Sequence, residues 1–203
     1  MLKKPSDMPS LTIVAERECT EDHQHALRRC ECCDTDAPEY EKEVQRYIRG
    51  LRIGSSSDAI HRKLLVIPSS SGIGGFAVAH ALFEQASTSG TTDKVIGFCE
   101  YGVDSDDSYA ISYIAIANKY RHHGLGSFLL KCVLADFADE EWRHPRTVPI
   151  GTLIHQKNLA SRALFIAADF MPDGVSEDPE YEVWYKLIDP KQRGPESSTL
   201  AWL

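Results

Sequence analysis

Residues 109–127 of this chain read YAISYIAIANKYRHHGLGS, a strand pattern that passes through a glycine turn into a helix. The first half alternates Ile and Tyr with small residues, which is typical of a β-strand. The first N–H groups of the helix that follows have no acceptor within the helix. Gly124 and Gly126 let the backbone approach an anion closely and adopt φ > 0, and Arg121 adds a charged donor. The stretch therefore predicts a site for a phosphate-bearing ligand.

The composition is that of one globular domain without a strongly basic surface. The chain has 203 residues, 42% of them hydrophobic and 26% charged, which suits one large core better than two domains. No apolar run is long enough to span a membrane, and the N-terminus lacks the apolar core of a signal peptide. We therefore expect a cytoplasmic protein. The net charge of −8 argues against a nucleic-acid surface and would suit a cationic or amine-bearing substrate.

The rest of the chain alternates strand and helix patterns around one sheet. Beside the opening strand, further strands are expected at residues 11–15, 63–67, 94–101, 147–155 and 182–188. Helices are expected at residues 38–51, 125–142 and 158–168. Residues 76–85 fit either a strand or a helix, residues 172–174 a turn, and residues 18–38 show no clean period. Residues 1–10 and 189–203 are expected to be loose tails.

Two strand–helix–strand units predict one domain over residues 1–203, of mixed α/β or α+β class. The crossover from the opening strand through the 125–142 helix should lead to a parallel strand. A cysteine and histidine cluster lies before these units. Its members are Cys19, His23, His25, Cys30, Cys32 and Cys33. They are numerous enough for a tetrahedral zinc ion but lack paired zinc-finger spacing, so we expect reduced thiols and no metal, with zinc as the alternative.

Residues 94–188 resemble the acyl-CoA-binding core of the GNAT superfamily of N-acetyltransferases. The family's phosphate loop, Gln/Arg-x-x-Gly-x-Gly/Ala after a strand, is matched by residues 121–126. After the next strand the family has an Asn, a small residue three positions later, a Tyr seven positions later, and often Gly-Phe. At that spacing this chain has Asn158, Ser161, Phe165, Asp169 and Phe170. The first three fall at i, i+3 and i+7, so one helix face should present them to a cofactor.

The resemblance implies the GNAT fold, a central twisted mixed sheet flanked by helices, with acetyl-CoA as co-substrate. It implies that the opening strand splays from the next parallel strand, where Ile114 and Ile116 would offer main-chain groups to the pantetheine arm. Backbone N–H groups would hold the pyrophosphate beside Arg121. They belong to His122, Gly124, Leu125, Gly126 and Ser127. Asn158 would bond the pantetheine arm, with Ser161 and Phe165 nearby.

The implied reaction is acetyl transfer to an amine, in which a base and an acid move protons and a strand N–H polarises the thioester. Two groups usual in the family are absent. The position of the family's Tyr is Phe165, which has no proton to donate, and the early Glu falls near Ala110. Glu100, on the neighbouring strand, is the expected replacement base. The candidate acids, which also fit structural roles, are Tyr113, Tyr181 and Tyr185.

Three functions follow from these observations. The first is an N-acetyltransferase acting on a small-molecule, peptide or protein amine. The second is a catalytically weak acyl-CoA-binding sensor or partner-binding module, suggested by Phe165. The third is a GNAT toxin that acetylates aminoacyl-tRNA, suggested by a loose resemblance of residues 22–49, although the acidic charge argues against a tRNA partner. The helix at 38–51 lies where the family builds its acceptor-binding wall. Oligomeric state is open, with a homodimer among the options.

Overall fold

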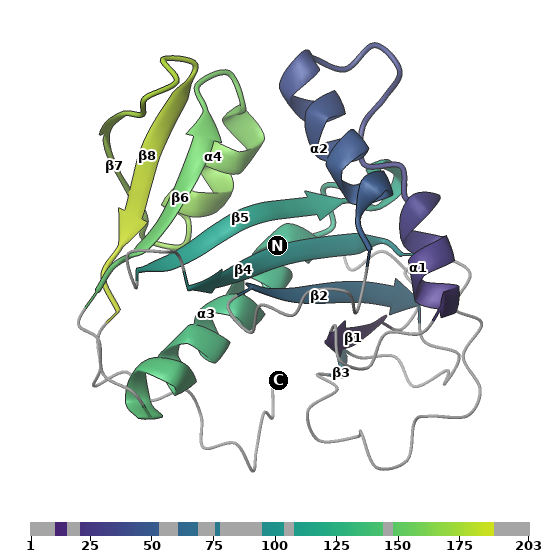
Figure 1. Cartoon of the computed structure of the whole chain (residues 1–203), viewed down its shortest axis with the longest axis horizontal. Coiled ribbons are helices and arrows are strands. Elements are labelled where there is room, and N and C mark those ends of the chain that lie inside the picture. Colours follow the sequence, from purple (N-terminus) through teal and green to yellow (C-terminus); the bar gives the residue numbers. More distant parts are fainter. Residues whose placement is uncertain are drawn as a thin grey trace.

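The computed structural model describes residues 11–15, 21–52, 61–68, 76–77, 95–103, 108–143 and 148–188 (Figure 1). The strands are β1 Leu11–Ala15, β2 His61–Pro68, β3 Phe76–Ala77, β4 Gly97–Val103, β5 Tyr109–Ile116, β6 Ile150–His155, β7 Met171–Val175 and β8 Tyr181–Lys186. The helices are α1 Glu21–Arg28, α2 Glu39–Gly50, α3 Leu125–Arg143 and α4 Leu159–Ile166, with a 3-10 turn at Asn118–Tyr120. The strands form one mixed sheet in the order β3-β1-β2-β4-β5-β6-β8-β7, which confirms the predicted fold class. A single domain over the whole chain stays a prediction.

The sheet divides into two arms between β5 and β6. These strands are parallel, as predicted, but pair only at Tyr109 with Ile150 and at Ala110 with Gly151. β4 pairs with β5 along its full length, and β6 pairs with β8 along its full length. Figure 1 shows β6, β8 and β7 turning away from β5, with α4 beside them. The predicted splay of the opening strand from its parallel neighbour is therefore present.

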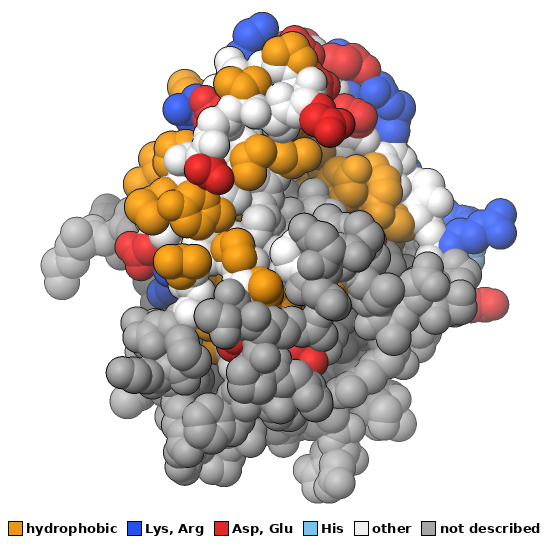
Figure 2. Space-filling view, turned by 60° about the vertical axis from the view of Figure 1, so that its left-hand side comes forward, with side chains coloured by type: hydrophobic (Ala, Val, Ile, Leu, Met, Phe, Trp, Pro, Cys, Tyr) orange, Lys and Arg blue, Asp and Glu red, His pale blue; other side chains and the backbone are white. Residues whose placement is uncertain are grey.

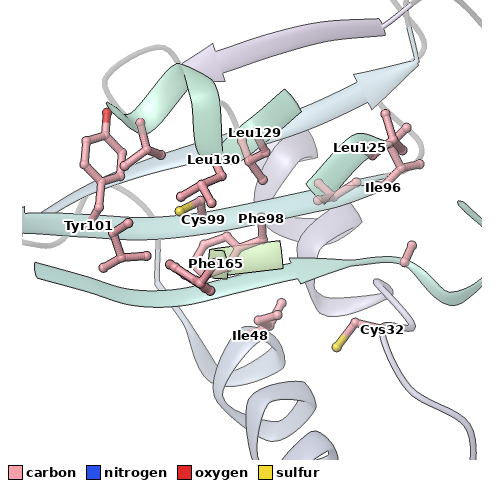
Figure 3. Packing of buried hydrophobic residues seen from close by; sticks show 14 of the residues in the cluster. Cys32, Ile48, Ile96, Phe98, Cys99, Tyr101, Leu125, Leu129, Leu130 and Phe165 are labelled. Atoms are coloured by element: carbon pink, nitrogen blue, oxygen red, sulfur yellow. The ribbon is translucent and has the colours of Figure 1, made fainter. Parts of the chain in front are cut away.

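Helices cover both faces of the sheet around β4. Tyr101 points to α3, where its hydroxyl donates to Asp136 at 2.7 Å and its ring meets Phe137 edge-on at 5.3 Å. Glu100, next along the strand, points the other way, because successive side chains of a strand face opposite sides, and meets Tyr47 of α2. Figure 3 shows the same division, with Leu129 and Leu130 on one side of β4 and Ile48 on the other.

The structure corrects two parts of the sequence interpretation. Helix α1 lies within residues 18–38, where the sequence shows no clean period; its eight residues bury only His23, Ala26 and Leu27, a stripe too short to stand out among the charges. Strand β7 occupies the residues expected as a turn. All five of its residues are exposed, and its pairing with β8 shifts between Pro172 and Val175. Turn-forming residues are thus accommodated in a bulge on an edge strand.

The β6-β8-β7 arm carries exposed apolar side chains. Those of this arm, of α4 and of the segment after β8 are Leu153, Leu159, Ile166, Met171, Val175 and Leu187. Figure 2 shows apolar side chains gathered over the described part of the face on that side of the molecule. None of the described helices combines the length and apolar character that a membrane crossing needs. The predicted tails and residues 78–85 lie outside the described residues.

Candidate active site

The turn between β5 and α3 has the backbone shape of an anion-binding cradle. His122 and Gly124 have positive φ values of 63° and 78°, and α3 begins directly afterwards at Leu125. The first bond of the helix runs from Phe128 N to Gly124 O at 3.0 Å, so the N–H groups of residues 125–127 have no acceptor within the helix. A Cβ placed on Gly124 would meet nothing within 4 Å. The turn is therefore open on the side where a side chain at position 124 would project.

Gly126 does not need the positive φ that its place in the turn allowed for. Its φ is not in the left-handed region. A Cβ at this position would lie 3.5 Å from Leu164 Cδ2 of α4 and 3.9 Å from Ile116 Cγ1 of β5. The missing side chain lets α3, α4 and β5 approach one another, so Gly126 shapes the site through packing, whereas Gly124 shapes it through backbone conformation.

The Arg121 side chain lies at the turn, as expected, but it forms a hydrogen bond and an ion pair with residues that precede β2. Its Nη2 donates to the carbonyl of Cys32 and lies 2.8 Å from Oε2 of Glu41 on α2. Nη1 and Nε have no partner among the described residues and stay available for a phosphate oxygen. The neighbouring imidazoles are exposed, and Nδ1 of His123 lies 2.6 Å from the Arg121 carbonyl.

The edge of β5 that faces the β6 arm lacks a strand partner beyond Ala110. The pairing with β4 passes over Ser112, which is an extra residue and makes a bulge. Ala117 N–H donates to Ile96 O at 2.8 Å on the β4 side. Because main-chain groups alternate along a strand, those of Ile114 and Ile116 face the open edge. This edge leads directly to the turn, so the two features form one continuous surface of main-chain donors and acceptors.

The three predicted positions on α4 are divided between two roles. Asn158 is the N-cap, and its Oδ1 accepts from Ser161 N at 3.0 Å, which leaves the amide nitrogen free to donate elsewhere. Phe165 is 2% exposed and meets Phe170 edge-on at 4.9 Å. Phe165 therefore packs in the core, whereas Asn158 caps the start of the helix. Its contact with a cofactor stays a prediction.

Glu100 lies at the centre of an aromatic cluster between β5 and α2. The carboxylate is 7% exposed and accepts a hydrogen bond from the hydroxyl of Tyr47. The Tyr47 ring stacks on that of Tyr113 with centroids 4.0 Å apart. The bulge at Ser112 turns Tyr113 toward α2, since Tyr109, four positions earlier, packs against Phe137 of α3. The predicted base and one predicted acid are thus brought together.

Burial raises the pKa of Tyr113, and the nearby charges of Glu43 and Glu100 raise it further. Burial likewise raises the pKa of Tyr181, and the nearby charges of Glu43 and Asp178 raise it further. Both hydroxyls therefore stay protonated at neutral pH and are able to donate. Tyr185, the third predicted acid, is half-buried on β8 opposite Gly151 and has no contact with this cluster among the described residues.

The sequence interpretation missed the residues that α2 contributes. Tyr40 stacks on His155 of β6 at 4.2 Å, the charge of Glu43 acts on Tyr181 of β8, and the Tyr47 hydroxyl donates to Glu100. The spacing i, i+3, i+7 was the available signal, because it places these side chains on one helix face. Two of the three are tyrosines, which fit the apolar side of an amphipathic helix equally well, so the spacing alone does not separate a site from the core.

The cysteine and histidine cluster does not form a metal site within the described residues. No group of three or more His, Cys, Asp or Glu side chains in them could hold an ion, and Cys19 lies outside the described ranges. Burial raises the pKa of Cys30 to about 11 and that of Cys32 to about 12, which favours the protonated thiols over the thiolates that a metal needs. The two side chains belong to the core between α1, α2 and the sheet.

Residues 74–170 match the model of the Acetyltransferase (GNAT) family. The chain carries a GNAT acetyltransferase domain. The matched range contains Glu100, the open edge of β5, the turn and α4. The GNAT match does not include α2 or β8, so Tyr40, Tyr47 and Tyr181 lie outside it.

Solved structures with this fold include a putative acetyltransferase of the GNAT family from Desulfovibrio desulfuricans, with 16% identity and a TM-score of 0.57 over 88% of this chain and 99% of that chain. The paia N-acetyltransferase from Thermoplasma acidophilum, in complex with coenzyme A, has 12% identity and a TM-score of 0.53 over 88% and 99%. A mutant AtaT toxin bound to the C-terminus of the antitoxin AtaR and acetyl-CoA has 14% identity and a TM-score of 0.53 over 87% and 93%. At these identities the likeness shows the GNAT fold alone. No curated protein sequence matches the chain.

Proposed function

We propose that this protein is an N-acetyltransferase that transfers an acetyl group from acetyl-CoA to an amine. The observation that carries the proposal is the continuous main-chain surface formed by the open edge of β5 and the turn at its end. An extended amide-containing arm suits an unpaired strand edge, and a pyrophosphate suits N–H groups at a helix start. Coenzyme A has both parts, in that order.

Each part of the cofactor has candidate partners in the chain. The N–H groups of residues 122 and 124–127 would hold the pyrophosphate, and Nη1 and Nε of Arg121 would add charged donors. The main-chain groups of Ile114 and Ile116 would pair with the pantetheine arm. The Asn158 amide nitrogen would donate to the same arm, while Oδ1 continues to cap α4. When bound, acetyl-CoA supplies the activated acyl thioester.

The chain's own groups would then manage the protons. Glu100 is the proposed base that takes a proton from the incoming ammonium, directly or through a water molecule. Tyr113, whose ring stacks on Tyr47 next to the same carboxylate, is the proposed donor to the departing sulfur, because its hydroxyl is protonated at neutral pH. Phe165 stands where the family usually has a Tyr and has no hydroxyl to donate, so a substitute donor is needed.

A sensor that binds acyl-CoA without turning it over is the second candidate, and it is favoured by the absence of the family's usual Tyr and early Glu, whose positions are Phe165 and Ala110. It predicts cofactor binding with no acetylated product. An aminoacyl-tRNA-directed toxin has weaker support, because the α2 face nearest the proposed acetyl position carries a carboxylate, Glu43, that would repel a phosphate backbone.

The test combines purified protein, acetyl-CoA and a panel of amines, amino acids, peptides and aminoacyl-tRNA, with product detected by mass spectrometry. We expect an acetylated amine whose rate of formation depends on protein concentration and falls in Glu100→Gln. Cofactor binding without any product would contradict the transferase proposal and support the sensor.

A further inference from the structure

One face of helix α2 contacts both arms of the divided sheet. Tyr40, Glu43 and Tyr47 make up this face, which we call the α2 bridge face. Tyr40 stacks on His155 of β6 at 4.2 Å, whereas Tyr47 stacks on Tyr113 of β5 at 4.0 Å. Figure 1 shows α2 standing over β5, opposite the end of β6 and α4. The bridge face therefore lines the space beside the open edge of β5, where the proposed acetyl group would lie.

Glu43 differs from the other glutamates of α2. Glu39 is paired with Arg46 at 2.7 Å and Glu41 with Arg121 at 2.8 Å. Glu43 has no Lys or Arg partner among the described residues, and its charge lies close enough to Tyr181 of β8 to raise the pKa of that hydroxyl in addition to burial. Its carboxylate charge is thus left without a Lys or Arg partner among the described residues, on the face of α2 that also carries Tyr40 and Tyr47.

The carboxylates of Glu43 and Glu100 both lie near Tyr113, one exposed and one buried. Glu100 is buried and Glu43 is exposed, yet both are close enough to Tyr113 for their charges to raise its pKa in addition to burial. Aromatic rings from both arms lie between and around them. Rings of this kind attract an ammonium group over their faces, and a carboxylate next to them adds an opposite charge.

Acyl transfer needs only one of these carboxylates as a base. The deeper one, Glu100, is beside the proposed reacting position. Glu43 has no proton to move in that step, so its uncompensated charge at the rim points to a second cation on the acceptor. An acceptor with an acidic tail would instead meet repulsion there.

We propose that the α2 bridge face is the acceptor-binding site and that the acceptor is a diamine or longer polyamine, with one amine reacting beside Glu100 and the other held by Glu43. This inference rests on the proposed transferase function and names its substrate class. The Tyr40 and Tyr47 rings would contact the apolar chain between the two amines.

The test compares three acceptors of one chain length: cadaverine, pentylamine and the corresponding ω-amino acid. All three have the same reacting amine and differ only at the far end. We expect kcat/KM to be highest for cadaverine, about tenfold lower for pentylamine and lower again for the amino acid. The difference should lie mainly in KM, because the distal charge binds equally in the ground and transition states.

Two isosteric variants locate the effect. Glu43→Gln should reduce kcat/KM for cadaverine to about the value for pentylamine and leave the affinity for coenzyme A unchanged. Glu39→Gln removes the same charge from the same helix, at the residue paired with Arg46, and should leave the preference for cadaverine intact.

Equal kcat/KM for the three acceptors would overturn the inference while leaving the transferase function standing. A cadaverine preference that survives in Glu43→Gln, or that disappears equally in Glu39→Gln, would also overturn it, since the preference would then come from net charge. Absence of any acetylated product would remove the proposed function and the inference with it.

Discussion

The guanidinium of Arg121 lies 2.8 Å from the carboxylate of Glu41, and this ion pair joins the turn after β5 to helix α2. The same nitrogen donates to the Cys32 carbonyl, and Asn118 N donates to Glu31 O at 2.8 Å. The proposed pyrophosphate turn and the proposed acceptor helix are therefore fastened to each other by contacts between residues far apart in sequence. A shift of the turn should therefore displace helix α2, and a shift of α2 should displace the turn.

Removing the two partners of this ion pair should change coenzyme A affinity in opposite directions. Arg121→Ala should weaken binding by about 10- to 100-fold, because it deletes charged donors that are each worth ~1.5–3 kcal/mol. Glu41→Gln keeps an oxygen that accepts from Nη2 but removes a negative charge near the phosphates, so binding should tighten by about two- to fivefold. Calorimetric titration gives both values. Weaker binding in Glu41→Gln would mean that the carboxylate is needed to hold Arg121 in place.

Glu100 and Tyr47 should contribute to turnover without contributing to cofactor binding. Glu100→Gln should lower kcat by about 10²- to 10⁴-fold, the range of a general base. Tyr47→Phe keeps the ring that stacks on Tyr113 and loses only the hydroxyl that positions Glu100, so a decrease of about tenfold is expected. Steady-state kinetics with the best acceptor measures both. Unchanged turnover in Glu100→Gln would eliminate it as the base.

The two roles assigned to Asn158 can be separated by substitution. Asn158→Asp retains the oxygen that caps α4 but has no amide donor, so stability should be preserved while coenzyme A affinity falls. Asn158→Ala loses both groups and should cost about 0.5–2 kcal/mol of unfolding free energy as well. Urea unfolding and calorimetry on the same samples make the comparison. Equal coenzyme A affinity of the Asp variant and the parent protein would show that the amide does not contact the cofactor.

Stability should decline at alkaline pH because of the buried thiols. Burial raises the pKa of Cys30 to about 11 and that of Cys32 to about 12, above their ordinary 9.0. The unfolded chain then loses protons near pH 9 while the folded chain retains them. This stabilisation is fully present below pH 9 and is lost as the pH rises through the folded values. Urea unfolding across that interval should show a shallower decline in Cys32→Ala than in the parent protein. Identical slopes would contradict the raised thiol pKa.

The sequence predicts the cofactor side of the site better than the acceptor side. The opening strand, the turn and the starts of α3 and α4 are encoded by local periodicity and glycine placement within residues 109–166, so their arrangement follows from short-range rules. Even within this range, the roles of Gly126 and Phe165 depend on tertiary packing. Gly126 accommodates Leu164, and Phe165 is directed into the core against Phe170. Neither contact has a signature in the local sequence.

The acceptor side depends on contacts between distant residues. Tyr47 meets Glu100, 53 positions later, and Arg121 meets Glu41, 80 positions earlier. The extra residue Ser112 in β5 turns Tyr113 to the α2 face, and an alternating Ile and Tyr pattern does not reveal such a bulge. These features follow from the register of paired strands, which a single sequence leaves open.

The most direct measurement is a calorimetric titration of coenzyme A into the parent protein, Gly124→Glu and Gly124→Asn. Gly124 has φ of 78° and open space beside it. Asn tolerates this backbone conformation, so its variant should bind nearly as well as the parent protein. A glutamate there would place a negative charge at the N–H groups and should weaken binding by at least about 100-fold. Undetectable binding to the parent protein, or full binding to folded Gly124→Glu, would contradict the assignment of the turn to the pyrophosphate.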